Sequence, residues 1–217
     1  MLGLSNNLAS GGFVDTFANL KSLIFDGSNE YLEIADDSSL DITDTITLSA
    51  WIKPSAISNA WQGIIAKGDL SDTGDVYKMY IDNAEKVQVR FNNESSSAVV
   101  SSALSNDTWY HICSTYDKDA GGSDEHKLYV DGVLVDTADF SDAISTNNDE
   151  LRFGITQNTS NAYYGNLDSI AIWNTTLSAN AVAEIYANGK GIDLRSNSGD
   201  YTSASSLVGY WRCGDGK

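Results

Sequence analysis

Apolar and polar residues alternate with a period of two along much of the chain beyond residue 20. The clearest example is the segment 46–53, in which Ile46, Leu48, Ala50 and Ile52 alternate with Thr47, Ser49, Trp51 and Lys53. Successive side chains of a β-strand point to opposite faces, so this pattern predicts a strand with one buried face. Similar short runs recur between turn residues, a spacing that is typical of an all-β sandwich.

Two hairpins are expected from the turn residues. Asp131-Gly132 separates the apolar runs 128–130 and 133–135, and this dipeptide tolerates the positive φ angles of a type I′ turn. A polar loop at 82–85 separates the runs 76–81 and 86–91. Further strands are predicted at 109–116, 150–154, 163–173 and 207–213. Residues 1–20, rich in Gly, Ser and Asn, are predicted to form a flexible arm before one domain over 21–217.

A single short helix is predicted from Ser178 to Asn188. Ser178 is a good N-cap residue, and Asn188-Gly189 can adopt the left-handed conformation that ends helices. Val182, Ile185 and Tyr186 recur at i, i+3 and i+4, so they share one face. We expect this face to pack across a sheet edge.

Composition excludes some classes of partner. The 217 residues include 13 basic and 30 acidic side chains, which gives a net charge of −17. Nucleic acids and anionic membranes would be repelled, because binding to phosphates relies on Lys and Arg. No apolar run reaches the length of a membrane span, and the first residues lack the features of a secretory signal. The two cysteines, Cys113 and Cys213, are expected to be unpaired, because free Cys usually behaves as a small buried hydrophobe.

Seven short segments occur in an order that resembles a known family. They are Phe25-Asp26-Gly27, residues 48–54, Trp109-Tyr110-His111-Ile112, Leu128-Tyr129-Val130-Asp131-Gly132, Gly165-Asn166-Leu167-Asp168, residues 173–178 and Gly209-Tyr210-Trp211. Together they are similar to the laminin-G-like branch of the concanavalin A-like jelly rolls, which also includes the pentraxins. The resemblance implies a jelly-roll sandwich of two antiparallel sheets. It says less about function, because such folds support many functions.

The resemblance also implies a calcium site. In relatives that bind calcium, the ion lies where the first strand pair meets the strand with the Gly-x-x-Asp motif. Carried over, this position corresponds to Asp26 and Asp168, with Ser28, Asn29 or Glu30 and backbone carbonyls as further ligands; Ca²⁺ prefers such mixed oxygen ligands. The alternative is structural: Asp26 forms an Asx-type turn before Gly27, and Asp168 accepts hydrogen bonds from strand-end amides.

Catalysis is not expected from these residues. The chain lacks the paired strand carboxylates of jelly-roll glucanases, and no nucleophile elbow or phosphate-binding loop occurs. His111 and His126 are the only histidines, and His111 is expected to be a strand residue rather than a base.

Aromatic residues near loops indicate a different kind of site. Trp61, Tyr163 and Tyr164 are candidates for stacking on the apolar face of a sugar, with packing over the rim of the sandwich as the alternative.

The leading hypothesis is a non-enzymatic, calcium-dependent binding or adhesion module that recognises a glycan or another cell-surface ligand. The missing signal and the N-terminal arm make the chain similar to laminin-G-like domains on bacteriophage virions, as head or tail appendages. We therefore expect a homo-oligomer or part of a larger particle, located on a virion or outside cells. The alternative is an accessory carbohydrate-binding domain of a secreted carbohydrate-active enzyme.

Overall fold

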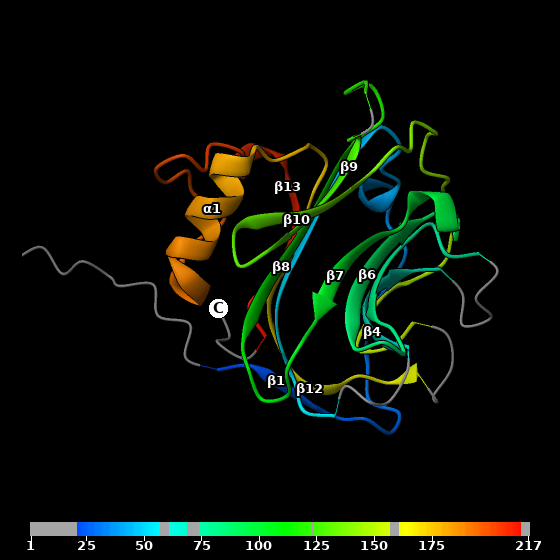
Figure 1. Ribbon diagram of the computed structural model, residues 1–217, viewed down its shortest axis with the longest axis vertical. Coiled ribbons are helices and arrows are strands. Elements are labelled where there is room, and N and C mark those ends of the chain that lie inside the picture. Colours follow the sequence, from blue (N-terminus) through cyan, green and yellow to red (C-terminus); the bar gives the residue numbers. More distant parts are fainter. Residues whose placement is uncertain (1–20, 57–60, 69–73, 123, 157–160, 214–217) are drawn as a thin grey trace, which may run out of the picture.

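The computed structural model contains two antiparallel sheets packed face to face, with one helix against the outer surface of the larger sheet (Figure 1). It describes residues 21–56, 61–68, 74–122, 124–156 and 161–213. The predicted arm at 1–20 lies outside these residues. Within them, no helix has the length and apolar character needed to cross a membrane. The jelly-roll prediction is confirmed.

The larger sheet has seven strands in the order β1-β12-β3-β8-β9-β10, with β13 also paired to β12. The strands are β1 (Leu23–Asp26), β3 (Thr45–Pro54), β8 (Tyr110–Asp117), β9 (His126–Val130), β10 (Val133–Ala138), β12 (Tyr164–Trp173) and β13 (Leu207–Trp211). β1 pairs with the first half of β12 and β13 with its second half. The first and last strands of the described chain therefore lie on the same side of β12.

The smaller sheet has six strands in the order β2-β11-β4-β5-β6-β7. These are β2 (Leu32–Ile34), β4 (Gln62–Lys67), β5 (Tyr77–Ile81), β6 (Lys86–Phe91), β7 (Val99–Ala103) and β11 (Leu151–Phe153). Alternate residues face the core between the sheets: Met79 is opposite Val89 and both are completely buried. The residues between them face outward, so the sheet has a second surface that is not part of the core.

The predicted alternation in β3 is confirmed. Ile46, Leu48, Ala50 and Ile52 are all completely buried in the core. The Asp131-Gly132 turn also has the expected geometry, with φ angles of 51° and 77°, and it joins β9 to β10 through the pair Val130 and Val133. Cys113 and Cys213 are both buried and unpaired.

The helix α1 (Ala179–Ala187) begins after the N-cap Ser178, whose side chain accepts a hydrogen bond from the Ala181 amide, and it ends at Asn188. Its position corrects the prediction that it crosses a sheet edge. Val182 and Ile185 pack on Trp173 and Cys113, which lie on the outer face of the seven-stranded sheet. Large apolar residues on both faces of this sheet require a cover on each side. Figure 1 shows α1 on the side away from β4, β6 and β7.

Candidate functional site

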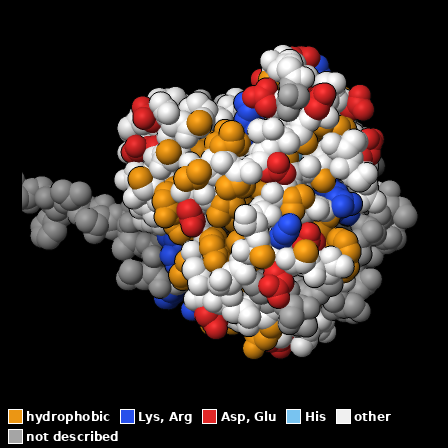
Figure 2. Space-filling model, viewed as in Figure 1, with side chains coloured by type: hydrophobic (Ala, Val, Ile, Leu, Met, Phe, Trp, Pro, Cys, Tyr) orange, Lys and Arg blue, Asp and Glu red, His pale blue; other side chains and the backbone are white. Residues whose placement is uncertain are grey.

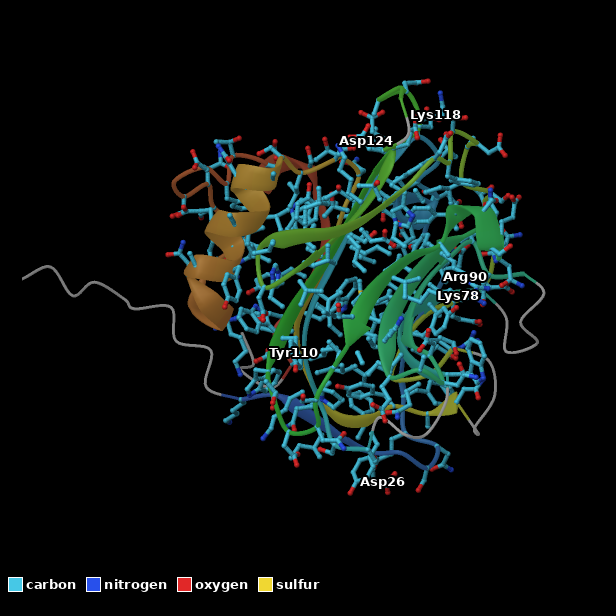
Figure 3. The ribbon with its side chains drawn as sticks, viewed as in Figure 1. Asp26, Lys78, Arg90, Tyr110, Lys118 and Asp124 are labelled. Atoms are coloured by element: carbon cyan, nitrogen blue, oxygen red, sulfur yellow. The ribbon has the colours of Figure 1, made fainter. Side chains whose placement is uncertain are left out.

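The segment after β1 forms a tight turn that is closed by its own hydrogen bonds. The Ser28 amide donates to Asp26 Oδ1 at 2.9 Å, and the Asp26 amide donates to Glu30 Oε2 at 2.9 Å. Gly27 has a φ of 77°, and a Cβ at this position would approach Tyr164 Cβ at 3.0 Å. Asp26, Ser28 and Asn29 form an exposed or partly exposed turn with the geometry of an Asx turn. Figure 3 shows Asp26 at one end of the sandwich.

Asp168 lies elsewhere, and it is completely buried. Its Oδ1 accepts a hydrogen bond from the Ser169 amide at 2.7 Å, and its Oδ2 is 3.3 Å from Lys190 Nζ. Lys190 Nζ also lies 3.8 Å from the centre of the Trp109 ring. The carboxylate therefore has a cationic partner inside the protein.

The structure does not bring Asp26 and Asp168 together. In the β1–β12 pairing Asp26 is opposite Tyr164, and Asp168 is four residues further along β12, which corresponds to about 13 Å of strand. Within the ranges that the structure describes, no three His, Cys, Asp or Glu side chains gather in a group that could hold a metal ion. Asp26 and Asp168 do not fit one shared calcium ion, and calcium dependence stays a prediction.

The three predicted ligand-binding aromatic residues divide into two groups. Trp61 is 40% exposed and Tyr164 is 39% exposed, so both rings are accessible. Tyr163 is completely buried, and its ring packs edge-on against Phe25 with centroids 6.1 Å apart. Burial raises the pKa of the Tyr163 hydroxyl well above its ordinary value. The prediction for Tyr163 is corrected: adjacent residues point to opposite faces, and Tyr163 is the one that enters the core.

The Gln62 side chain links the two segments that carry the exposed rings of Trp61 and Tyr164. The Gln62 side chain is buried, and its Oε1 accepts a hydrogen bond from the Tyr164 amide at 2.9 Å. Its Nε2 donates to the Ala56 carbonyl at 2.6 Å. The starts of β4 and β12 are thereby held together at the end of the sandwich that carries the Asp26 turn. The segments that carry Trp61, Tyr164 and the Asp26 turn therefore meet at this end of the sandwich, with the Trp61 ring on the outer face of the six-stranded sheet.

A further group of residues, which the sequence analysis missed, lies on the outer face of the six-stranded sheet. The Trp61 ring packs on the Tyr80 ring with centroids 5.7 Å apart. Lys78 Nζ and Arg90 Cζ lie 5.7 Å and 5.9 Å from the centre of the same Tyr80 ring. The Tyr80 hydroxyl donates a hydrogen bond to Gln88 Oε1. We call these five residues, Trp61, Lys78, Tyr80, Gln88 and Arg90, the aromatic–basic platform.

The signal for this platform was present in the sequence. In β5, Lys78 and Tyr80 alternate with core residues, and in β6, Gln88 and Arg90 do the same. The outer face of a sheet usually carries polar residues, so this alternation of polar and core residues does not by itself indicate a binding site. Only the structure reveals that Trp61, from the start of β4, joins them.

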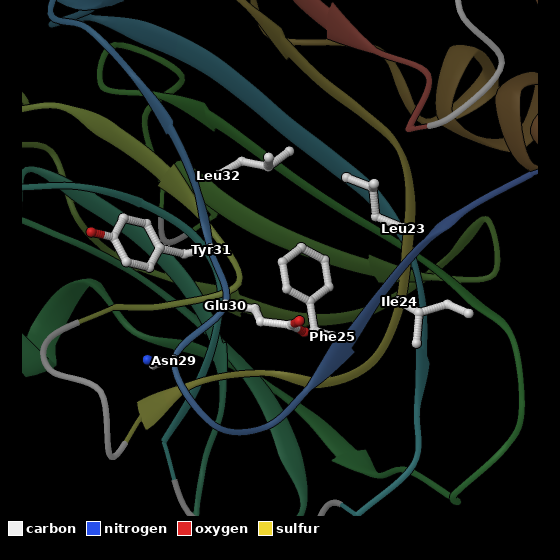
Figure 4. Close-up of a pocket in the computed structure, with 7 residues that line it drawn as sticks. All are labelled: Leu23, Ile24, Phe25, Asn29, Glu30, Tyr31 and Leu32. Carbon is white, nitrogen blue, oxygen red and sulfur yellow. The ribbon is translucent and has the colours of Figure 1, made fainter.

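A hollow of about 340 Å³ lies between β1 and β2, close to the same end of the sandwich (Figure 4). In Figure 4 the side chains of Leu23, Glu30 and Leu32 point into this space, whereas those of Ile24 and Tyr31 point away from it. In Figure 4 the Phe25 ring forms the inner wall, facing the core. The residues that line this hollow are mostly apolar.

Neither histidine is placed to act as a surface base. His111 and His126 are completely buried, and burial lowers the pKa of each imidazole to about 3. His111 Nε2 lies 2.9 Å from Ser49 Oγ, and His126 Nε2 lies 2.7 Å from Ser114 Oγ. Both are neutral structural residues at ordinary pH, in agreement with the strand-residue interpretation of His111.

Comparisons with solved structures agree on the fold. A Bacteroides ovatus protein ascribed to carbohydrate binding has a TM-score of 0.62 at 18% identity, over 88% of this chain and 50% of its own. The CBM40 domain of the Ruminococcus gnavus IT-sialidase, bound to α2,3-sialyllactose, has a TM-score of 0.61 at 16% identity, over 76% of this chain and 95% of its own. A heptameric SAP-like pentraxin from Limulus polyphemus has a TM-score of 0.58 at 15% identity, over 77% and 82%.

These identities are low, so the likenesses establish the fold alone. This chain also spans only half the length of the Bacteroides protein. No curated protein sequence matches it. A family model described as the concanavalin A-like lectin/glucanases superfamily matches residues 26–183, which is most of the domain. The chain is therefore a laminin-G-type member of the concanavalin A-like lectin/glucanase superfamily.

Proposed function

We propose that this protein is a non-catalytic glycan-binding module whose ligand contacts Trp61 and Tyr164. The observation that supports this most is the exposed Trp61 ring seated on Tyr80 beside polar side chains. An aromatic ring of this kind has a large apolar area and limited flexibility, which suits stacking on a sugar face. Apolar area with a few placed polar groups is typical of small-molecule sites.

The solved structures support the same class of ligand. Carbohydrate binding is ascribed to the Bacteroides protein, and the sialidase CBM40 domain was solved with a bound sialyllactose. A single sugar site is expected to be weak, whereas several linked sites gain about 10²- to 10⁴-fold in avidity. We therefore propose display in several copies, as a homo-oligomer or as an adhesion protein on a phage virion.

A second candidate function is supported equally by the relatives. The CBM40 domain belongs to a sialidase, so a domain of this fold can accompany a catalytic part. In this alternative the same residues bind the polysaccharide, and a hydrolase elsewhere in the protein cleaves it. The two functions share the site and differ in what the module is attached to.

The proposal is tested by removing the exposed rings. We expect Trp61→Ala and Tyr164→Ala each to weaken binding to a glycan found on an array at least tenfold, which corresponds to about 1.4 kcal/mol. The matched control is Tyr186→Ala, because Tyr186 is 38% exposed on α1, away from the site. Melting curves establish that each variant is folded. Wild-type affinity in both site variants, or no binding by the multimerised wild-type protein to any glycan, would overturn the proposal.

A further inference from the structure

Basic side chains on the outer face of the six-stranded sheet are mostly neutralised by carboxylates. Lys78 Nζ lies 3.0 Å from Asp75 Oδ2, with both side chains buried. Arg152 Nε lies 3.0 Å from Glu33 Oε2, and its Nη2 lies 2.6 Å from Glu150 Oε2. Such pairing is expected, because a buried charge is costly unless it has a partner.

Arg90, which is half-buried, has no such carboxylate partner among the described residues. Its Nε atom is buried and has no hydrogen-bond partner, and its guanidinium lies against the Tyr80 ring. A buried donor without a partner lowers the stability of the folded protein. The chain has 30 acidic residues, yet none of those that the structure describes pairs with Arg90.

The neighbours of Arg90 increase this local positive charge. Arg90 is directly opposite Lys78 in the β5–β6 pairing, and like charges in such a position repel. Asp75 neutralises Lys78 and leaves one positive charge for the pair. Figure 3 shows Lys78 and Arg90 side by side, and Figure 2 shows basic side chains at the surface in the same region.

The unpartnered guanidinium lies close to the proposed sugar-stacking ring. Trp61 and Arg90 contact the same Tyr80 ring at 5.7 Å and 5.9 Å. The Trp61 ring centre and Arg90 Cζ can therefore be no further apart than the sum of these two distances. One or two linked sugar rings can bridge such a span. We propose that the aromatic–basic platform binds a sugar bearing a carboxylate, with the ring on Trp61 and the carboxylate on Arg90. This inference rests on the proposed glycan-binding function.

A carboxylate is the anion that best matches this site. The planar guanidinium forms two parallel hydrogen bonds with a carboxylate, a geometry that a lysine cannot reproduce. The net charge of −17 repels anions at long range, so a charged ligand must gain its affinity from a short-range pair. A carboxylated sugar supplies an acceptor for the terminal nitrogens of the Arg90 guanidinium and an apolar ring face for Trp61.

Two pairs of probes test this inference by titration calorimetry. The first is trigalacturonate and its fully methyl-esterified form, in which each carboxylate is replaced by a neutral methyl ester. The second is 3′-sialyllactose and lactose. We expect the charged member of at least one pair to bind the wild-type protein roughly tenfold more tightly, the size of effect typical of one charge-assisted pair. Arg90→Gln should remove that preference and leave affinity for the neutral member unchanged.

Control variants separate the outcomes. Lys21→Gln makes the same change in net charge at an exposed position and should keep the preference. Arg90→Lys keeps the positive charge but loses the planar guanidinium, so this variant should show only part of the wild-type preference for the charged probe. Binding of sugars through Trp61 without preference for carboxylates, or with a preference that survives Arg90→Gln, would overturn this inference and leave the proposed function intact. Absence of binding to every sugar in an otherwise folded protein would overturn both.

Discussion

His111 and His126 are buried in the seven-stranded sheet, and their burial links folding to pH. Burial lowers the pKa of each to about 3, from an ordinary value of 6.5. In the unfolded chain these two histidines therefore take up two protons as the pH falls below about 6.5, whereas in the folded protein they take up none until near pH 3. Stability is complete above pH 6.5 and is lost below it, by at most about 1.4 kcal/mol per histidine per pH unit.

We expect the free energy of unfolding to fall between pH 6.5 and 5, a window above the ordinary titration of Asp and Glu. Urea denaturation at pH 7, 6 and 5 measures this effect. His126→Gln should reduce the fall in the free energy of unfolding with pH, because only one of the two histidines then takes up a proton on unfolding. A stability that does not change over this window would show that the histidines are accessible to protons in the folded state.

Individual side chains were the hardest feature to predict from sequence. Tyr163 and Tyr164 are adjacent and identical in type, yet one is completely buried and the other is 39% exposed. Their assignment depends on the register of β12, which pairs with β1 and β3 from distant parts of the chain. Trp61 was correctly expected near a loop, but its contact with Tyr80 depends on how β4 pairs with β5.

Strands, hairpins and the helix were predicted well because their signals are local. The Asp131-Gly132 turn and the Ser178 cap need only a few neighbouring residues, and both have the expected geometry. The position of α1 was wrong because it depends on the outer face of a distant sheet. Trp173 lies on β12 and Cys113 on β8, and both require a cover. Nothing near residue 180 in the sequence indicates this.

The β9–β10 turn is also expected to contribute to the docking of α1. Gly132 has a φ of 77°, and a Cβ there would lie 3.1 Å from Tyr186 Cδ1 and 3.3 Å from Ala183 Cα. Gly132→Ala should therefore lower the free energy of unfolding by roughly 1–2 kcal/mol for the left-handed backbone, and by a further amount for crowding against the helix.

Gly121 offers a matched control for this prediction. It has a similar φ of 71°, and a Cβ there would meet nothing within 4 Å. Gly121→Ala should show the backbone cost alone, so the difference between the two variants in urea denaturation isolates the contact with α1. Equal destabilisation by both substitutions would mean that the helix does not pack closely against the turn.

At the scale of the whole molecule, the fold followed from the order of seven short segments, each weak by itself. Order constrains topology, because the segments must occupy successive strands of two sheets. It does not fix which side chains converge, and the pairing of Asp26 with Asp168 failed for this reason. The bulge between Asp168 and Ala171 shifts the pairing of β12 with β3, and the resemblance gave no indication that Lys190 would neutralise Asp168.

Measurements of the stability of the whole molecule can distinguish a structural role of Asp168 from a role in calcium binding. Asp168→Asn removes the charge that pairs with Lys190, which is one quarter exposed, so we expect a loss of about 1–3 kcal/mol. This loss should be equal in millimolar calcium and in EDTA, as measured by thermal melting. Calcium bound at the Asp26 turn alone would stabilise the wild-type protein by about 2.7 kcal/mol at a hundredfold excess over Kd, and Asp26→Ala would remove that gain. If Asp168→Asn instead abolishes a calcium-dependent rise in melting temperature, Asp168 takes part in calcium binding and its role is not structural alone.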